Sequence, residues 1–254
     1  MRLHKFIAAC GYTSRRRAEL LIQAGRVKVN GKSLMSLGTT VKKEDAVTVN
    51  GEIISLPEPK TILFNKPPGI ITSTHDTHER LTVMDYLPPA LLDIGVLPIG
   101  RLDRETEGLL LLTNVGELNH RVTHPSFEIE KEYVALVNGK PSKDALAKLA
   151  AGVKIEEHLT APAKVLKTVA DGNNTQVVLV IHEGKKRQIR RMFEAVGYKV
   201  LRLARTRVGN IRLAGLDPKA WRDAKPAELR GLDIGYDEII RKHAAFKTTG
   251  NSET

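Results

Sequence analysis

The sequence lacks the features of several protein classes. Its 254 residues contain one cysteine, Cys10, which excludes an internal disulfide and a thiolate metal cluster. We expect Cys10 to pack as a small apolar side chain in the reducing cytosol. No apolar run approaches the ~20 residues that cross a bilayer. The polar start, Met1 to Lys5, is unlike a secretory signal, so we expect no membrane association.

Common nucleotide and hydrolase motifs are also missing. There is no Gly-x-Gly-x-x-Gly, which argues against a dinucleotide or methyl-donor domain, and no Gly-x-Ser-x-Gly elbow. The glycines from 25 to 31 and from 95 to 100 do not complete a phosphate loop. His75 and His78 lie near Asp76, but no further ligand spacing supports a metal, and we expect a polar loop there.

Positive charge is abundant. Lysine and arginine number 40 against 29 acidic residues, which gives a net charge of +11. This balance indicates a polyanionic partner, with nucleic acid ahead of an anionic membrane.

The first 56 residues predict a small basic domain. Apolar residues from Leu3 to Cys10 recur at helical spacing, and Ser14 can cap a second helix that opens with three arginines. Arginines there oppose the helix dipole, and a bound phosphate would relieve the repulsion. A strand over 27–29 followed by Asn30-Gly31 predicts a hairpin.

This segment resembles the S4-like RNA-binding domain. The similarity rests on Ser-Arg-Arg-x-Ala-x-x-Leu-Ile-x-x-Gly-x-Val-x-Val-Asn-Gly, which runs from Ser14 to Gly31. The resemblance implies that the basic residues contact RNA, namely Lys5, Arg15, Arg16, Arg17 and Arg26. For each arginine the alternative is a solvated helix face.

The stretch from Gly100 to Asn114 organises the larger part of the chain. Four leucines, 109–112, predict a short buried strand, so the preceding charges must lie at its mouth. Asp103 has Arg101 and Arg104 as near neighbours, and two guanidiniums would favour its charged form. Such a carboxylate can act as a nucleophile or as an electrostatic partner. The alternative is a surface loop with salt bridges.

The same stretch resembles the signature of the RsuA/RluB-type pseudouridine synthases. Gly-Arg-Leu-Asp-x-x-Thr-x-Gly-Leu-Leu-Leu-Leu-Thr-Asn is present in full, although the usual Asn-Asp-Gly continuation reads Asn114-Val115-Gly116. The resemblance implies that Asp103 is catalytic. A second family motif, Glu-Gly-Lys-x-Arg-Gln-Ile-Arg-Arg-Met, begins at Glu183 and implies that Lys185 pairs with Asp103.

The resemblance assigns further roles. Tyr133 of Lys-x-Tyr would stack on the target uracil, although an aromatic residue in a strand ordinarily packs in the core. Arg101 and Leu203 would line the substrate pocket, and Arg187 and Arg190 would contact RNA.

The implied architecture is α+β, with a catalytic domain over 60–240. A linker over 55–60 could let the first domain swing, the sheet is expected to be mostly antiparallel with flanking helices, and residues 241–254 form a polar, frayed tail.

The implied reaction is the isomerisation of uridine to pseudouridine in ribosomal RNA by a cytoplasmic monomer without cofactor or metal. The region from Thr206 to Trp221 favours large-subunit RNA. The alternatives are a small-subunit enzyme, a non-catalytic RNA-binding or ribosome-assembly protein, and a methyltransferase that uses the same S4-like module.

Overall fold

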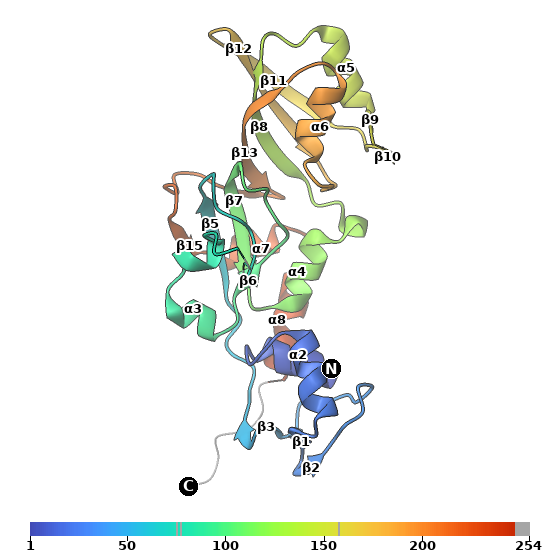
Figure 1. The fold of residues 1–254 in the computed structure, drawn as a ribbon, viewed down its shortest axis with the longest axis vertical. Coiled ribbons are helices and arrows are strands. Elements are labelled where there is room, and N and C mark those ends of the chain that lie inside the picture. Colours follow the sequence, from blue (N-terminus) through green and yellow to red (C-terminus); the bar gives the residue numbers. More distant parts are fainter. Residues whose placement is uncertain (75, 77, 157, 247–254) are drawn as a thin grey trace.

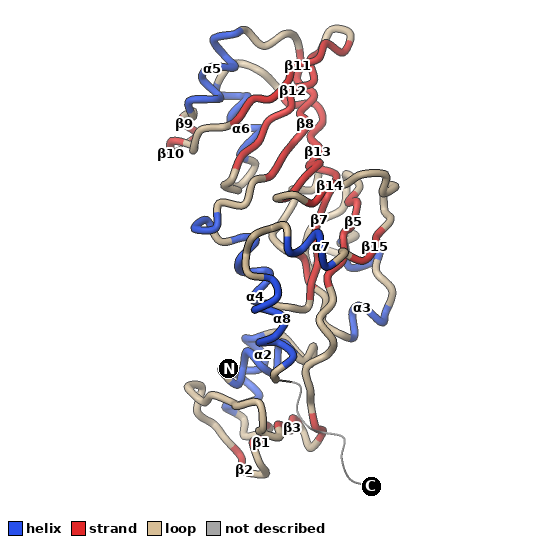
Figure 2. Tube along the Cα trace, turned by 180° about the vertical axis from the view of Figure 1, so that it is seen from behind, coloured by secondary structure: helices blue, strands red, loops and turns tan. Residues whose placement is uncertain are grey.

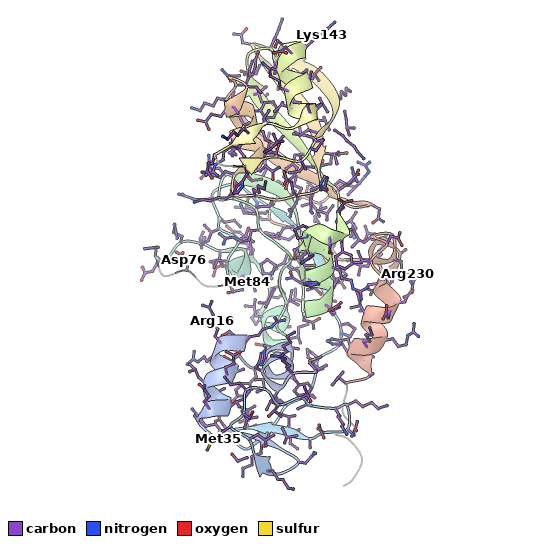
Figure 3. The ribbon with its side chains drawn as sticks, turned by 90° about the vertical axis from the view of Figure 1, so that its right-hand side faces the viewer. Arg16, Met35, Asp76, Met84, Lys143 and Arg230 are labelled. Carbon is purple, nitrogen blue, oxygen red and sulfur yellow. The ribbon has the colours of Figure 1, made fainter. Side chains whose placement is uncertain are left out.

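The computed structural model describes residues 1–74, 76, 78–156 and 158–246. The molecule is elongated, with the N-terminal domain at one end and a long twisted sheet that runs from the middle to the other end (Figure 1). Figure 3 shows Met35 near the first end and Lys143 at the opposite end. None of the described helices is long and apolar enough to cross a bilayer.

The N-terminal domain packs two helices on a small antiparallel sheet of order β2-β1-β3-β4. Ser14 caps the second helix as predicted, because its Oγ accepts a hydrogen bond from the Arg17 backbone N–H at 3.3 Å. The Asn30-Gly31 turn has positive φ at both residues, as a tight hairpin requires. The elements are α1 (Leu3–Ala9), α2 (Arg15–Gln23), β1 (Val27–Val29), β2 (Lys32–Ser33), β3 (Val47–Val49) and β4 (Glu52–Ile53).

The second domain is built on a mixed sheet with the main order β11-β12-β8-β13-β7-β5-β15, in which only the β13–β7 pair of the described strands is parallel. Strands β14 and β6 attach to β13 and β7. The prediction of an α+β protein with a mostly antiparallel sheet is confirmed. The strands are β5 (Thr61–Lys66), β6 (Leu97–Pro98), β7 (Thr106–Thr113), β8 (Lys131–Asn138), β11 (Lys164–Asp171), β12 (Asn174–Ile181), β13 (Val200–Val208), β14 (Ile211–Arg212) and β15 (Trp221–Asp223).

Apolar cores cover both faces of this sheet. In β7, Leu110 and Leu112 belong to one core, and Leu109 and Leu111 belong to the other, so the predicted buried strand is buried on both sides. The helices of the first core are α3 (Pro89–Asp93), α5 (Lys143–Ala151) and α6 (Gln188–Ala195). Those of the second core are α4 (Gly116–Thr123), α7 (Pro226–Arg230) and α8 (Tyr236–Ala244).

Two strands follow irregular segments. Strand β8 begins at Lys131, after the 3-10 turn η2 (Pro125–Phe127) and after Glu128, which has φ of 48°. Strand β11 begins at Lys164, after a small hairpin of β9 (Lys154–Ile155) and β10 (His158–Leu159). A further 3-10 turn, η1 (Val83–Tyr86), precedes α3.

The C-terminal helix connects the two domains. Ile239 of α8 packs in the second-domain core, His243 Nε2 lies 3.0 Å from the Pro57 carbonyl of the linker, and Phe246 packs on the N-terminal core. Figure 2 shows α8 between the sheet and the N-terminal domain. The frayed tail predicted from Arg241 is therefore wrong for residues 241–246, and residues 247–254 lie outside the described part.

A close backbone approach also joins the domains. A Cβ atom added to Gly95 would lie 3.0 Å from Gly11 Cα, and one added to Gly11 would lie 2.9 Å from the Asp93 carbonyl oxygen. Both glycines have positive φ, which other L-residues rarely adopt. The interface therefore depends on the absence of side chains at these two positions.

Candidate active site

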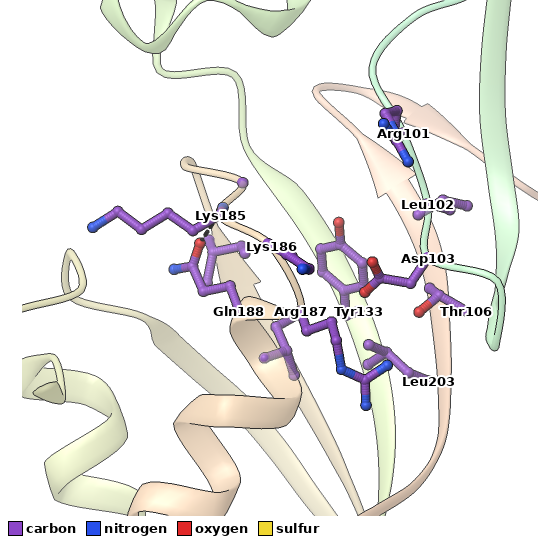
Figure 4. Close-up of a pocket in the computed structure, with 13 residues that line it drawn as sticks. Arg101, Leu102, Asp103, Thr106, Tyr133, Lys185, Lys186, Arg187, Gln188 and Leu203 are labelled. Carbon is purple, nitrogen blue, oxygen red and sulfur yellow. Dashed lines mark hydrogen bonds between the residues drawn. The ribbon is translucent and has the colours of Figure 1, made fainter. Parts of the chain in front are cut away.

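Asp103 lies in the loop between β6 and β7 and lines a cavity of about 560 Å³. The volume is in the range of small-molecule sites. One wall carries Asp103 and the start of β7, the floor carries Tyr133 and Leu203, and the opposite wall is the segment 184–189 (Figure 4).

The loop that carries Asp103 is held by Thr72 and Lys66. Thr72 Oγ1 donates to the Leu102 carbonyl at 3.0 Å and accepts from the Leu102 N–H at 3.2 Å. Lys66 is fully buried at the end of β5, and its Nζ donates to three carbonyl oxygens, those of Pro67, Arg104 and Thr106, at 2.8–3.1 Å. These bonds fix the backbone on both sides of Asp103.

Burial lowers the pKa of Lys66 to about 8, and the nearby carboxylates of Glu105, Asp103 and Glu107 partly oppose this shift. The sequence analysis assigned Lys66 no role. The available signal was a lysine two residues after the apolar run 62–64.

Arg190 of α6 joins the two walls of the cavity. Its Nη2 donates to the Glu105 carbonyl at 3.1 Å, and its Nη1 donates to the Val200 carbonyl at 3.0 Å. Burial lowers the pKa of this guanidinium, as does Arg187, while Asp103 and Glu105 raise it. In this structure Arg190 binds the protein's own backbone, and its contact with RNA stays a prediction.

The Asp103 carboxylate is half-buried and has no hydrogen bond or ion pair within the described part of the chain. Arg104, which was expected to flank it, donates through Nε to the Gly69 carbonyl at 3.1 Å and lies 3.6 Å from Glu105. Arg101 is exposed at the rim of the cavity. The expected clamp of two guanidiniums is not formed, because the loop aims Arg104 at the neighbouring turn.

Lys185 was also expected to pair with Asp103, and here it does not. Its Nζ lies 3.5 Å from Glu183 Oε2 and 3.4 Å from the Leu159 carbonyl. Figure 4 shows its side chain directed away from Asp103, whereas Lys186 extends toward Tyr133. The reason is local, since Glu183 lies only two residues away. The catalytic role of Lys185 stays a prediction.

Tyr133 and Leu203 both line the Asp103 cavity, and their contacts with a substrate base stay predictions. Strand β13 runs between β8 and β7, with Arg205 opposite Tyr133 and Leu203 opposite Thr106. The ring of Tyr133 is buried to 9% exposure. The result is a carboxylate without a partner that faces an aromatic ring over an apolar floor, opposite a cationic segment. A ligand that carries a flat polar ring on a negatively charged chain fits these features.

The predicted RNA contacts in the N-terminal domain are exposed, and Figure 3 shows Arg16 projecting outward from α2. Lys5 and Arg15 line a second cavity of about 710 Å³ between the two domains. Arg26 donates to Asn50 Oδ1 at 2.6 Å. Arg187 lines the Asp103 cavity, with φ of 53°.

No cluster of metal-ligating side chains occurs within the described ranges. His78 is described and uses its backbone N–H on Asp76, whereas His75 lies outside the described residues.

Comparison with known proteins identifies both domains. Residues 60–195 match the model of the RNA pseudouridylate synthase family, and residues 1–47 match the S4 domain. The chain is 44% identical over 233 residues to ribosomal large subunit pseudouridine synthase B of Bacillus subtilis, covering 91% of this chain and 95% of that protein. It is 37% identical over 235 residues to the dual-specificity RNA pseudouridine synthase RluF of Escherichia coli, covering 91% and 78%.

A solved structure is also similar. The chain matches a crystal structure of a pseudouridylate synthase with a TM-score of 0.66 and 31% identity, covering 91% of this chain and 99% of that one. Fold, cavity and sequence agree, and the chain belongs to the RNA pseudouridylate synthase family.

Proposed function

We propose that this protein converts uridine to pseudouridine at a specific position in the RNA of the large ribosomal subunit. The observation that supports this most is the unpaired Asp103 carboxylate beside the Tyr133 ring in one cavity with a cationic wall. The Bacillus subtilis relative, named for the large ribosomal subunit, supports the choice of substrate.

The target base has to leave its stack before its glycosidic bond can be reached, which costs a few kcal/mol. Stacking on the Tyr133 ring recovers about 1–3 kcal/mol. Cations of the segment 185–187 attract the flanking phosphates. Together these contacts bring the flipped uridine to Asp103.

The reaction conserves all atoms of the nucleoside. The C1′–N1 bond breaks, the base rotates, and a C1′–C5 bond forms; C5 releases a proton and N1 gains one. Asp103 acts either as the nucleophile at C1′ or as the base of an elimination, and both routes use its carboxylate. The apolar side chains of Leu102, Ile189 and Leu203 retain the detached base and exclude water.

Lys185 is our proposed partner for Asp103, which requires its Nζ to leave Glu183 when RNA binds. Lys186, which already extends toward Tyr133, is the second candidate for the same role. Tyr133 and Leu203 hold the base, and Arg101 and Arg187 line its entrance.

The exposed basic residues of α2 and of the cavity between the domains would bind the surrounding RNA, and we propose that the protein acts as a monomer in the cytoplasm. Mapping pseudouridine in ribosomal RNA from cells with and without the gene tests the proposal. Loss of one large-subunit pseudouridine is expected. Loss of a small-subunit position would reassign the substrate, and an unchanged map would favour a non-catalytic RNA-binding protein.

A further inference from the structure

A smaller cavity of about 200 Å³ adjoins the candidate active site. Arg101, Tyr133 and Gly184 line both cavities, so the two meet at the Tyr133 ring. Its volume is several times the roughly 30 Å³ that one water molecule occupies in the liquid. A group larger than a water molecule therefore fits in the cavity next to the proposed position of the target base.

Besides Arg101, which belongs to both cavities, two further cations line the smaller one, Lys131 and Arg205. Arg205 lies opposite Tyr133 across the β8–β13 pair, and Lys131 lies two residues before Tyr133, on the same side of β8. The strands therefore place a lysine, an aromatic ring and an arginine in one neighbourhood.

Neither cation has a carboxylate partner among the described residues. Arg205 is only 6% exposed, and its Nε donates to the Leu109 carbonyl at 2.7 Å. Lys131 Nζ donates to the His182 carbonyl at 3.0 Å. The Nη groups of Arg205 make no hydrogen bond within the described residues and are not among their buried unpaired atoms, so they reach the open space of the cavity and can donate to an anion there.

The electrostatics of the cavity support an anion. Burial, and then the charge of Arg205, lowers the pKa of Lys131 to about 8. Glu183 also lines the cavity, but its carboxylate accepts from the Ala161 N–H at 2.9 Å and lies 3.5 Å from Lys185. The Glu183 carboxylate thus already has partners on the side of α6 and the β9–β10 hairpin.

We propose that Lys131 and Arg205 form a binding site for a phosphate group of the substrate RNA, adjacent to the target uridine. This inference rests on the proposed function, because only RNA held at Asp103 brings a phosphodiester to the other side of Tyr133. The phosphate fixes the backbone of the flipped nucleotide while its base lies on the ring.

The test is a cycle between a protein change and an RNA change. Lys131→Met keeps the length of the side chain and removes its charge. A neutral methylphosphonate, placed in turn at each linkage near the target uridine, removes the charge of one phosphate. Affinities are measured across a salt series in the Asp103→Asn background, with Lys167→Met on the exposed face of β11 as the control.

We expect Lys131→Met to weaken RNA binding about tenfold, as for a charged hydrogen bond, and to reduce the salt slope by about 0.7, the value for one phosphate contact. At one linkage, the methylphosphonate should weaken RNA binding by the protein that retains Lys131 about tenfold. At that same linkage it should not weaken RNA binding by Lys131→Met any further. Lys167→Met should respond as wild type at every linkage.

Thermal melting separates this role from a structural one. Lys131→Met removes a buried cation next to Arg205 but also the donor to the His182 carbonyl, and because these two effects oppose each other its melting temperature should stay close to that of wild type. A lower melting temperature with an unchanged salt slope would overturn the proposal, because Lys131 would then only support the fold. The proposal also fails if no linkage near the target responds in the protein that retains Lys131.

Failure of the proposed function has a different signature. In that case the wild-type protein forms no pseudouridine in the same RNA. If only the phosphate site is wrong, the wild-type protein still forms pseudouridine. The loss of affinity from Lys131→Met and the loss from the methylphosphonate are then independent, so the two factors multiply at every linkage.

Discussion

The two walls of the Asp103 cavity are built differently. The loop of Asp103 is fixed by Thr72, Lys66 and Arg190, which bond backbone groups on both sides of the carboxylate. The facing segment 184–187 is exposed, and its cations reach solvent or Glu183. The acid is thus positioned before substrate arrives, which is the arrangement that lowers the cost of reaching the transition state. On this account, the cation that pairs with Asp103 takes up its position only when RNA is bound.

The largest effect is expected for Asp103→Asn. The amide cannot serve as nucleophile or base, so turnover should fall at least about 10³-fold, whereas RNA affinity stays within a few-fold. Glu105→Gln is the matched control, since the Glu105 side chain is exposed and its carboxylate lies 3.6 Å from Arg104 at the protein surface. Pseudouridine formed in a ribosomal RNA fragment measures both. Equal activity of Asp103→Asn and Glu105→Gln would refute the role of the carboxylate.

The exposed wall of the cavity is tested by Lys185→Met and Lys186→Met. If Lys185 steers Asp103, its loss should lower kcat about 10²-fold and leave RNA affinity nearly unchanged. Lys186→Met should then act mainly on affinity. The reverse pattern would transfer the pairing role to Lys186.

The fixed side is tested by Lys66→Met. The Arg104 and Thr106 carbonyls lose their buried donor, so the free energy of unfolding should fall by about 2–3 kcal/mol, and kcat should fall with it. Lys60→Met is the control, because Lys60 lies near the protein surface and pairs with Asp223. Its expected cost is below about 1 kcal/mol. Denaturant unfolding compares the two, and equal losses would contradict the clamp.

A smaller effect is expected at the domain interface. Gly95→Ala and Gly172→Ala both place a side chain at positive φ, which costs roughly 1–2 kcal/mol, but Gly172 has open space around it. Only Gly95→Ala should speed proteolysis of the linker over 55–60 and weaken RNA binding a few-fold. Identical cleavage rates would show that the contact with Gly11 does not hold the domains together.

The smallest effect is expected for Arg16→Gln. Removing one phosphate contact should reduce the salt slope of RNA binding by about 0.7–1 and leave kcat unchanged. Arg230→Gln is the control, since Arg230 pairs with Asp237 at 2.9 Å and lies on the other side of the molecule in Figure 3. A slope that changes equally in both variants would place the RNA elsewhere.

Much of this architecture could be read from the sequence because its signals are local. The Ser14 cap, the Asn30-Gly31 turn and the strand of four leucines each depend on neighbouring residues. The meeting of Asp103 and Tyr133 came from the family resemblance, since periodicity alone does not say which strands pair.

The remaining features depend on partners that a sequence does not display. Lys66, Arg190 and Arg205 donate to backbone carbonyls. Every residue has such a carbonyl, so the sequence does not show which one is the partner. Lys185 turns to Glu183 because two acceptors compete for one flexible side chain. The bridging role of α8 had a signal that was overlooked, the helical spacing of Ile239 and His243, with the apolar Phe246 just after the end of the helix.

The most direct test of the central claim labels the target uridine with tritium at C5 or, in a separate RNA, at C6. With wild-type protein in excess over a ribosomal RNA fragment, we predict release of the C5 label and retention of the C6 label, because the new bond forms at C5. Asp103→Asn should release neither while it still binds the RNA. Retention of the C5 label by wild type, or equal release from both positions, would contradict the account.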